Sequence, residues 1–190
     1  MHALFGKRDG AAVDLAEVRA GRGGIAIRGM QLPCELSAAG DVNGDGLADV
    51  LVGAPGGDPG ELYHGGESHV IFGKRETTAV QLSAVRAGEG GFAIRGKGSP
   101  RWKGAGGGDV NGDGLADLLL AELASTAGAR SYAGTCFVVF GKSGGPAVEL
   151  SGVLAGRGGF AIHPSPDTPL AQASIAAAGD MDGDGLDDVL

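Results

Sequence analysis

Short apolar runs separated by glycine, proline and aspartate follow one another along the whole chain. Residues 35–40, 49–54, 68–73 and 91–96 form one such series, and most of these runs are rich in Val, Ile or Phe. Short runs of this kind, bounded by turn residues, are typical of β-strands. A helical solenoid would need apolar residues at a spacing of about 3.6 over ten or more positions, and no stretch of the sequence shows it. The pattern therefore predicts an all-β protein.

The series repeats along the sequence with a period of 67 or 68 residues. The segment "LFGK" begins at residue 4 and returns as "IFGK" at 71 and "VFGK" at 139. Four strands per repeat of this length are the makeup of one β-propeller blade. Between the third and fourth strands, the segment "VDLAEVRAG" and its counterparts are expected to hold one short helical turn, with Asp14 or its equivalent near the start.

Counted in this way, the chain holds about three blades' worth of four-stranded antiparallel sheet. A propeller ring closes with about four to eight blades, so three blades cannot close one. We therefore expect either a piece of a longer protein, which we favour, or a homodimer in which two copies complete a six-bladed ring. The predicted units are the third and fourth strands of a split blade at 1–29, whole blades at 30–96 and 97–164, and the first and second strands of a split blade at 165–190.

An acidic, glycine-rich decamer follows the first predicted strand of each repeat. It reads "GDVNGDGLAD" at 40–49 and 108–117, and "GDMDGDGLDD" at 179–188. The net charge is −8, but the decamers hold 11 of the 23 acids, so the rest of the chain has 12 acids against 15 Lys and Arg residues. The acidity therefore belongs to three local sites rather than to a general surface field. The 39 glycines recur with the same period, which indicates tight turns in a repeat protein.

The oxygen-bearing side chains of the first decamer are placed to surround a cation. Asp41, Asn43 and Asp45 stand at alternate positions, Asp49 follows, and the intervening glycines allow the backbone to curl tightly. With one backbone carbonyl these groups would form the all-oxygen shell that Ca²⁺ favours, whereas Mg²⁺ prefers a stricter octahedron and zinc or copper prefers nitrogen and sulfur. Plain Asn-Gly and Asp-Gly hairpin turns are the alternative, but they do not require acids at the first and ninth positions.

Two other calcium-binding loops begin with the same letters. An EF-hand needs flanking helices and a Glu at the twelfth loop position. A dockerin would also need a carboxylate at that position and two loops much closer together. This chain has Val52 or Leu120 at the twelfth position, so neither type fits.

The combination of "GDVNGDGLADVLVGAP", "VIFGK" and "GGFAIRG" resembles the FG-GAP repeats of integrin α-subunit propellers, especially their bacterial multi-repeat relatives. The resemblance covers nearly the whole chain and implies a parent ring of seven four-stranded blades, with one calcium ion between the first and second strands of each blade, or about three Ca²⁺ per chain. Two departures are visible: the "GAP" at 53–55 becomes "AEL" at 121–123, and the Phe-Gly pair usually found before the calcium loop is missing. The implied ligands are four side chains and one leucine carbonyl per loop: Asp41, Asn43, Asp45, Leu47 and Asp49; Asp109, Asn111, Asp113, Leu115 and Asp117; and Asp180, Asp182, Asp184, Leu186 and Asp188.

These features predict a calcium-binding β-propeller scaffold, which is a structural or protein-interaction module of a secreted or surface adhesion-type protein and not an enzyme. Extracellular modules bind calcium at about 10⁻⁴–10⁻³ M, and a calcium-poor cytosol would leave such sites empty. We therefore expect an extracellular or cell-surface location, although the start "MHALFGKRDG" is not a signal peptide.

Two other functions are alternatives to the scaffold. A lectin-like propeller would bind carbohydrate through aromatic-bearing loops, with candidates at Tyr63, His64, Trp102 and Tyr132. A hydrolase is less favoured, because the four histidines are scattered and no Ser/His/Asp or Cys/His set recurs. Carboxylates that hold Ca²⁺ would also be poor general acids.

The composition disfavours two classes of partner. No basic stripe with interleaved aromatic residues suggests nucleic acid, and no apolar run approaches the ~20 residues of a membrane span. The ligand is therefore expected to be a protein or a glycan that the sequence does not identify. Cys34 and Cys136 occupy non-equivalent repeat positions, which favours two free thiols over a disulfide.

Overall fold

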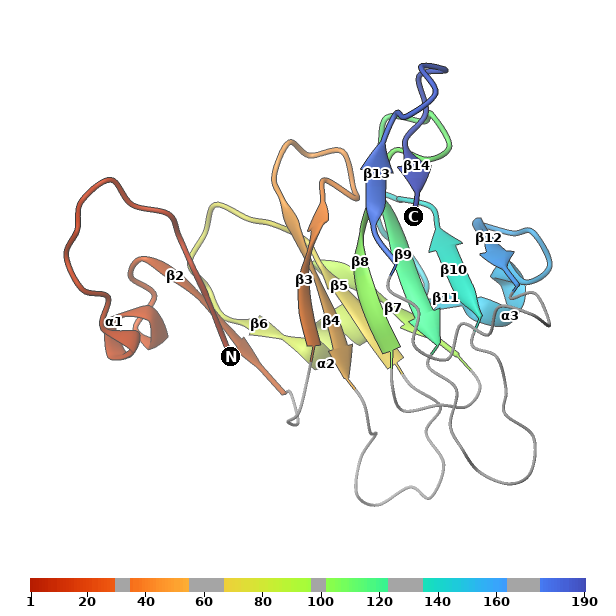
Figure 1. The fold of residues 1–190 in the computed structure, drawn as a ribbon. Helices are drawn as coiled ribbons and strands as arrows, with labels where there is room; N and C mark the ends of the chain where they lie inside the picture. Colours follow the sequence, from red (N-terminus) through yellow and green to blue (C-terminus); the bar gives the residue numbers. More distant parts are fainter. Residues whose placement is uncertain (30–34, 55–66, 97–101, 123–134, 164–174) are drawn as a thin grey trace, which may run out of the picture.

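The computed structural model describes residues 1–29, 35–54, 67–96, 102–122, 135–163 and 175–190. Within these residues the protein is all-β, since short strands form four mostly antiparallel sheets and the helices span no more than five residues each. Figure 1 shows the sheets standing side by side in chain order. This row of sheets is an incomplete β-propeller and confirms the predicted fold class.

The middle of the chain forms two complete four-stranded blades, in which strands adjacent along the chain are hydrogen-bonded antiparallel neighbours. Blade 2 consists of β3 (Glu35–Gly40), β4 (Asp49–Ala54), β5 (Glu67–Ile71) and β7 (Gly91–Arg95). Blade 3 consists of β8 (Trp102–Gly108), β9 (Asp117–Glu122), β10 (Cys136–Val139) and β12 (Gly159–Ile162).

One pair of antiparallel strands stands at each end of the row. The N-terminal half-blade consists of β1 (His2–Leu4) and β2 (Gly24–Arg28), which are the repeat equivalents of β5 and β7. The C-terminal half-blade consists of β13 (Ala177–Gly179) and β14 (Asp188–Val189), which are the repeat equivalents of β3 and β4. The C-terminal half-blade lies beside β8 of blade 3.

Two short strands were not predicted, because the sequence indicated only four strands per repeat. β6 (Val80–Gln81) pairs in parallel with β2, and β11 (Val148–Glu149) pairs in parallel with β7. Each therefore extends the sheet of the preceding blade, which covers the open edge of its last strand. Two residues are too short to produce a hydrophobic alternation, so the pairing could not be seen in the pattern.

The predicted helical turns are present in all three repeats, at α1 (Leu15–Arg19), α2 (Leu82–Arg86) and α3 (Leu150–Val153). Asp14 caps α1, since its carboxylate accepts the amide of Ala16 at 2.8 Å, as is usual for an N-cap aspartate. The equivalent caps of α2 and α3 make no such side-chain bond. None of the described helices is long and apolar enough to cross a membrane.

The strand predicted over residues 68–73 has different limits, Glu67–Ile71. The amide of Phe72 still donates to the carbonyl of Gly90, just before β7, at 3.0 Å, but the amide of Gly73 donates to the Asp49 side chain at 2.7 Å instead of to a strand. Gly73 thus leaves the strand ladder to support the acidic loop of the same blade.

The core lies between the faces of neighbouring blades. The largest cluster joins blades 2 and 3 around the fully buried Phe92, and its glycine-rich strand β8 allows close approach: a Cβ on Gly106 would lie 3.0 Å from the carbonyl oxygen of Ala39. Cys136 is buried beside this core with a free thiol, as favoured from the sequence, while Cys34 lies outside the described residues. The cluster consists of Ala39, Val42, Leu51, Val70, Phe92, Ile94, Leu118, Leu120, Phe137, Val139, Leu150 and Val153.

Candidate metal centre

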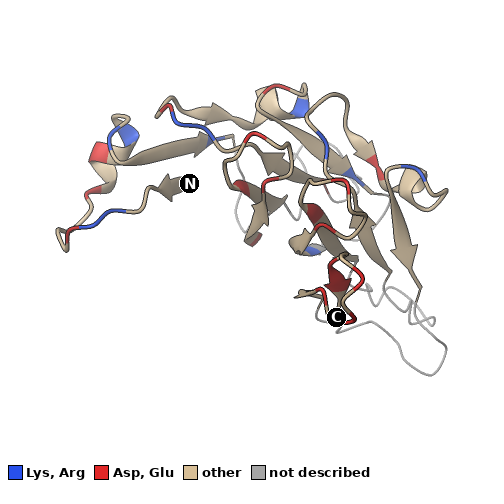
Figure 2. Ribbon diagram, turned by 90° about the horizontal axis from the view of Figure 1, so that it is seen from above, with Lys and Arg blue, Asp and Glu red and all other residues tan. Residues whose placement is uncertain are grey.

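The three acidic decamers join β3 to β4, β8 to β9, and β13 to β14, so each occupies the same place in its sheet. Backbone hydrogen bonds connect them in a row. The amide of Ala116 donates to the carbonyl of Asp41 at 2.9 Å, and the amide of Asp187 donates to the carbonyl of Asp109 at 3.0 Å. Figure 2 shows their acidic residues gathered where the three loops lie next to one another.

The first aspartate of the first loop organises the curled backbone around itself. The Asp41 carboxylate accepts the amides of Gly44, Asp45 and Gly46 at 2.8, 3.0 and 2.7 Å. This geometry requires a left-handed backbone at Gly44 and Gly46, whose φ angles are +78° and +81°. Residues with a Cβ rarely adopt that conformation, which explains the glycines at these two positions.

The third and fifth positions of the loop contact each other. The amide nitrogen of the Asn43 side chain donates to Asp45 at 2.9 Å, and the Asn43 side-chain oxygen accepts the Asp45 backbone amide at 3.0 Å. The other Asp45 carboxylate oxygen accepts the amide of Leu47 at 2.8 Å. These bonds fix both side chains on the loop that Asp41 organises.

The ninth position ties the loop to the rest of the blade. Asp49 is buried, and its two carboxylate oxygens accept the amides of Val42 at 2.8 Å and Gly73 at 2.7 Å. Burial raises the pKa of Asp49, the two amides oppose this, and the charges of Asp45 and Asp41 raise it further. A cation nearby would favour the ionised form of this carboxyl group.

The second loop repeats the first bond by bond. Asp109 accepts the amides of Gly112, Asp113 and Gly114 at 2.8, 3.0 and 2.8 Å, and Asn111 contacts Asp113 as Asn43 contacts Asp45. Asp117 is fully buried and accepts the amides of Val110 at 2.9 Å and Gly141 at 2.8 Å. Burial raises the pKa of Asp117, as it does that of Asp49.

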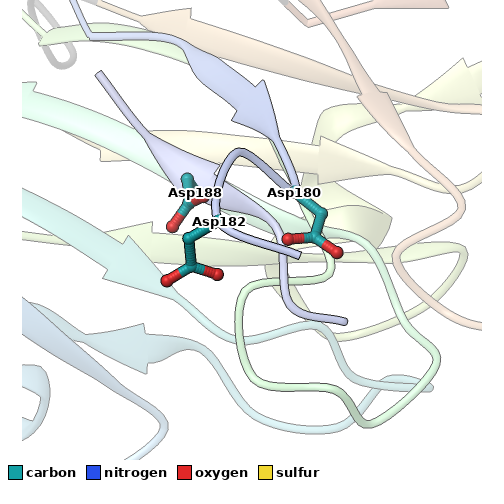
Figure 3. A group of neighbouring side chains, drawn as sticks. All are labelled: Asp180, Asp182 and Asp188. Carbon is teal, nitrogen blue, oxygen red and sulfur yellow. The ribbon is translucent and has the colours of Figure 1, made fainter. Parts of the chain in front are cut away.

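The third loop has the same curl but an open surrounding. Asp180 accepts the amides of Gly183, Asp184 and Gly185, and Asp188 accepts the amide of Met181 at 2.7 Å. One carboxylate oxygen each of Asp180, Asp182 and Asp188 lies within 4.8 Å of the other two. Figure 3 shows these three side chains. Asp184 lies outside this group, and its carboxylate accepts the amide of Leu186 at 2.9 Å.

The donor chemistry of each loop suits a calcium ion, and among the described residues only the third loop brings three carboxylates within 4.8 Å of one another. An ionised carboxylate has about four lone-pair sites, and the hydrogen bonds above occupy three at Asp41 and two each at Asp45 and Asp49, so each retains acceptor capacity. All these donors are oxygens, as Ca²⁺ prefers. The leucine carbonyls at the seventh loop position stay predicted ligands: Leu47, Leu115 and Leu186.

The candidates for carbohydrate binding are not placed by the structure. Tyr63, His64 and Tyr132 lie outside the described residues, and Trp102 is described only by its backbone at the start of β8.

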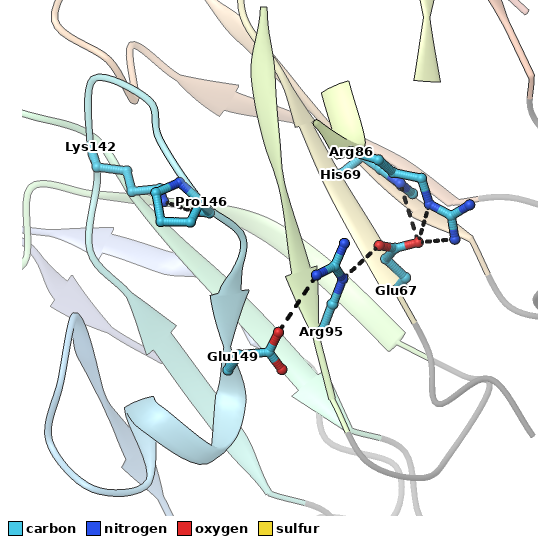
Figure 4. Close-up of polar contacts among 7 residues, drawn as sticks. All are labelled: Glu67, His69, Arg86, Arg95, Lys142, Pro146 and Glu149. Carbon is cyan, nitrogen blue, oxygen red and sulfur yellow. Dashed lines mark hydrogen bonds and ion pairs between the residues drawn. The ribbon is translucent and has the colours of Figure 1, made fainter. Parts of the chain in front are cut away.

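A buried polar cluster in blade 2 was missed at the level of sequence. Glu67 on β5 accepts hydrogen bonds from Arg86 of α2 at 2.7 Å and from Arg95 of β7 at 3.1 Å, and His69 is buried beside it, as Figure 4 shows. Neither ring nitrogen of His69 has a hydrogen-bond partner among the described residues, since its Nε2 lies 3.5 Å from Glu67. Burial lowers the pKa of His69, while the two arginines lower that of Glu67 against the effect of burial. Pairing β5 with β7 places Glu67 opposite Arg95, and this register could have indicated the cluster.

Comparison with known families identifies one part of the chain. Residues 36–71 match the family model of the FG-GAP repeat, and they span β3, the first acidic loop, β4 and β5. This segment is an FG-GAP repeat, which is a structural or interaction module rather than a catalytic one. The comparison with curated proteins gave no match.

Proposed function

We propose that the protein is a calcium-binding β-propeller scaffold, a module of a secreted or surface adhesion-type protein that presents its blades to another protein. One observation carries the proposal: three equivalent loops, hydrogen-bonded in a row, each hold an all-oxygen donor set on a glycine-rich curl. A plain hairpin turn would not need this set three times.

The charge of the loops supports a bound cation. Each loop gathers at least three carboxylates, and none of the ion pairs found among the described residues involves one of them. The carboxylates of one loop repel one another, most of all in the third loop, where oxygens of three of them lie within 4.8 Å. A divalent cation would relieve that repulsion while using the lone pairs that the backbone amides leave free. Calcium would therefore stabilise the loops in the curled form.

The expected affinity for calcium supports a location outside the cell. Extracellular modules bind calcium at about 10⁻⁴–10⁻³ M, and millimolar calcium outside the cell would fill such sites. The role of calcium here is structural, and the partner that the propeller engages is a protein of unidentified sequence.

Calcium titration of the chain by isothermal calorimetry tests the proposal. We expect about three ions per chain, and about two after Asp45→Asn, Asp113→Asn or Asp184→Asn. Asparagine keeps the oxygen that accepts the neighbouring backbone amide. At positions 45 and 113 it loses the oxygen that accepts the Asn43 or Asn111 side chain, so circular dichroism of each variant checks that the fold is kept. Asp9→Asn is the matched control, because Asp9 pairs with Lys7 on the surface far from the decamers in sequence. Calcium binding that is absent, or that survives all three changes together, would overturn the proposal.

A further inference from the structure

The exposed apolar side chains of the described residues are concentrated at the two ends of the row of blades. Only two of the ten large exposed hydrophobic residues, Leu36 and Leu154, lie elsewhere. The eight others lie on the N-terminal half-blade and its helix-bearing connection, or on β12 and the C-terminal half-blade: Leu4, Phe5, Val13, Leu15, Phe160, Met181, Leu186 and Leu190.

Several of these residues have repeat equivalents that are buried between the N-terminal half-blade and blade 2 or between blades 2 and 3. Leu15 is 49% exposed, whereas its equivalent Leu82 is 5% exposed. Phe160 is 40% exposed, whereas its equivalent Phe92 is fully buried. The internal blade junctions therefore indicate what would cover the exposed set, namely another blade of the same kind.

A cavity marks where one of these residues would be received. It has a volume of about 250 Å³ and lies between the N-terminal half-blade and blade 2, with Ile25, Phe72 and Gly73 in its lining. At the equivalent junction of blades 2 and 3, Val42 of the first acidic loop is fully buried, and its carbonyl lies 2.9 Å from where a Cβ on Gly141 would be. Gly141 is the repeat equivalent of Gly73, so the cavity corresponds to the space beside Val42.

The third acidic loop carries the residue equivalent to Val42. This residue is Met181, which is 68% exposed, more than any other large apolar side chain of the described residues except Leu190. Methionine is flexible and fills irregular apolar spaces well. The cavity at one end and Met181 at the other therefore form a complementary pair.

Hydrogen-bonding groups at the two ends are complementary in the same register. Within blade 3, the Asp117 carboxylate accepts the amide of Gly141. The repeat equivalent of Asp117 is Asp188 at the C-terminal end, and the equivalent of Gly141 is Gly6 at the N-terminal end. Within the described residues of one chain, Asp188 and Gly6 do not form this bond. The amide of Ala116 likewise donates to the carbonyl of Asp41. Its equivalents at the ends are the amide of Ala48, which is an exposed residue, and the carbonyl of Asp180.

The parallel strand pairing between successive blades also has equivalent partners at the two ends of the row. In blade 2, β7 pairs in parallel with β11, with Ile94 opposite Val148 and Arg95 opposite Glu149, an ion pair of 3.7 Å that Figure 4 shows. The equivalent partners are Ile162, the last residue of β12, with His163 after it, and Val13 and Asp14 before α1. Among the described residues β12 has no strand on this edge.

A cation–π contact between blades 2 and 3 also has equivalent residues at the two ends of the row. Lys142 lies 4.5 Å from the centre of the Phe92 ring, across the junction of blades 2 and 3. Lys7 and the exposed Phe160 are the equivalents of these two residues. A docked Lys7 would therefore cover Phe160.

We propose that two copies of this chain dock reciprocally, so that the C-terminal half-blade of each completes a blade with the N-terminal half-blade of the other. β14 pairs with the partner's β1, Met181 enters the partner's cavity, and the third acidic loop gains the Gly6 amide that anchors its last aspartate. Two such contacts join the copies in one closed ring of blades. The docking rests on the repeat geometry and none of its contacts requires calcium.

The molar mass in solution, measured by light scattering on a sizing column, is the first test. We expect a dimer in calcium, and we expect Met181→Gln to weaken it at least tenfold, because most of the side chains that line the cavity are apolar. Leu154→Gln, a similar change at an exposed residue away from both ends, should leave the dimer intact. A monomer, a dimer that Met181→Gln does not weaken, or an open-ended series of larger assemblies would contradict reciprocal docking.

A disulfide test fixes the register. In blades 2 and 3, Val50 pairs with Ile71 and Leu118 with Val139, so docking places Val189 opposite the partner's Leu4. Chains with both Leu4→Cys and Val189→Cys should form an oxidised dimer on a non-reducing gel, because paired strands bring Cα atoms within disulfide range. His2→Cys with Val189→Cys is two residues out of register and should cross-link far less. Equal cross-linking of both pairs would contradict the proposal.

Calcium titration of Met181→Gln separates this inference from the proposed function. We expect the variant to bind calcium at its first two loops although its dimer is weakened. A dimer that persists in a chain without calcium binding would leave the docking standing and overturn only the calcium scaffold.

Discussion

The second and third acidic loops share a motif and a backbone conformation but differ in their surroundings. In the second loop, Asp117 is fully buried and accepts two amides, one from its own loop and one from Gly141 of the neighbouring connection. In the third loop, Asp188 is half-buried and accepts only the amide of Met181 among the described residues. The curl of the loop is therefore local, whereas the anchoring of its last aspartate depends on a third strand in the same blade.

Removal of calcium should lower the free energy of unfolding more than any other change, and it should affect the second and the third acidic loops alike. At about 2 mM calcium and a Kd of about 0.1 mM, each site adds about 1.8 kcal/mol to the free energy of unfolding, so three sites add about 5 kcal/mol. Urea unfolding in calcium and in chelator measures this difference. Asp113→Asn and Asp184→Asn should each reduce it by about one third; a difference that neither variant changes would show that the loops are not the sites.

Loss of the ninth-position aspartate should distinguish the two loops. In chelator, Asp117→Ala should lower the free energy of unfolding by about 2–4 kcal/mol, because it leaves the amides of Val110 and Gly141 without a partner in a buried site. Asp188→Ala, made in the Met181→Gln background so that no docked partner supplies the Gly6 amide, should lower it by less than about 1 kcal/mol, since water then reaches the third loop. Urea unfolding measures both, and equal losses would show that the extra anchor contributes nothing.

The pH dependence of stability should distinguish blade 2 from blade 3, because blade 3 has Phe137 where blade 2 has His69. The pKa of His69 is below its ordinary value of 6.5 in the fold, so its stabilising contribution is complete above pH 6.5 and is lost as the pH falls below it. His69→Phe should remove up to about 1.4 kcal/mol per pH unit of this slope between pH 6.5 and 5. Urea midpoints over that range measure it. Glu67, whose pKa is lowered from 4.5, contributes only below the range, and an unchanged slope in the variant would contradict the assignment.

The smallest expected effect on stability is a difference between two equivalent lysines, Lys142 and Lys74. Lys142→Met should lower the free energy of unfolding by about 0.5–1 kcal/mol, because the ammonium group lies over Phe92 and donates to the carbonyl of Pro146, as Figure 4 shows for the second contact. Lys74→Met should have a smaller effect, since Ile25 replaces the aromatic ring at the equivalent place. Urea unfolding of both variants tests the difference, and a larger loss at Lys74 would contradict it.

Much of the fold and of the candidate site could be predicted because the same local sequence pattern occurs three times along the chain. The strands, the helical turns and the curled loops follow from short apolar runs, from Asp14 as a cap and from the paired glycines of each decamer. The strands β6 and β11 and the cluster around His69 could not be predicted in the same way, since they depend on which segments of different repeats lie side by side.

The sequence by itself determined the strands, the loop curl and the oxygen donors, because these depend on residues within a few positions of one another. Only the tertiary structure decided which loop aspartates are buried, where β6 and β11 pair, and why Val42 is covered while Met181 is exposed. The physical reason is that burial and strand pairing depend on the neighbouring blade. A repeat with a neighbour on both sides and a repeat at the end of the row therefore share a motif but differ in environment.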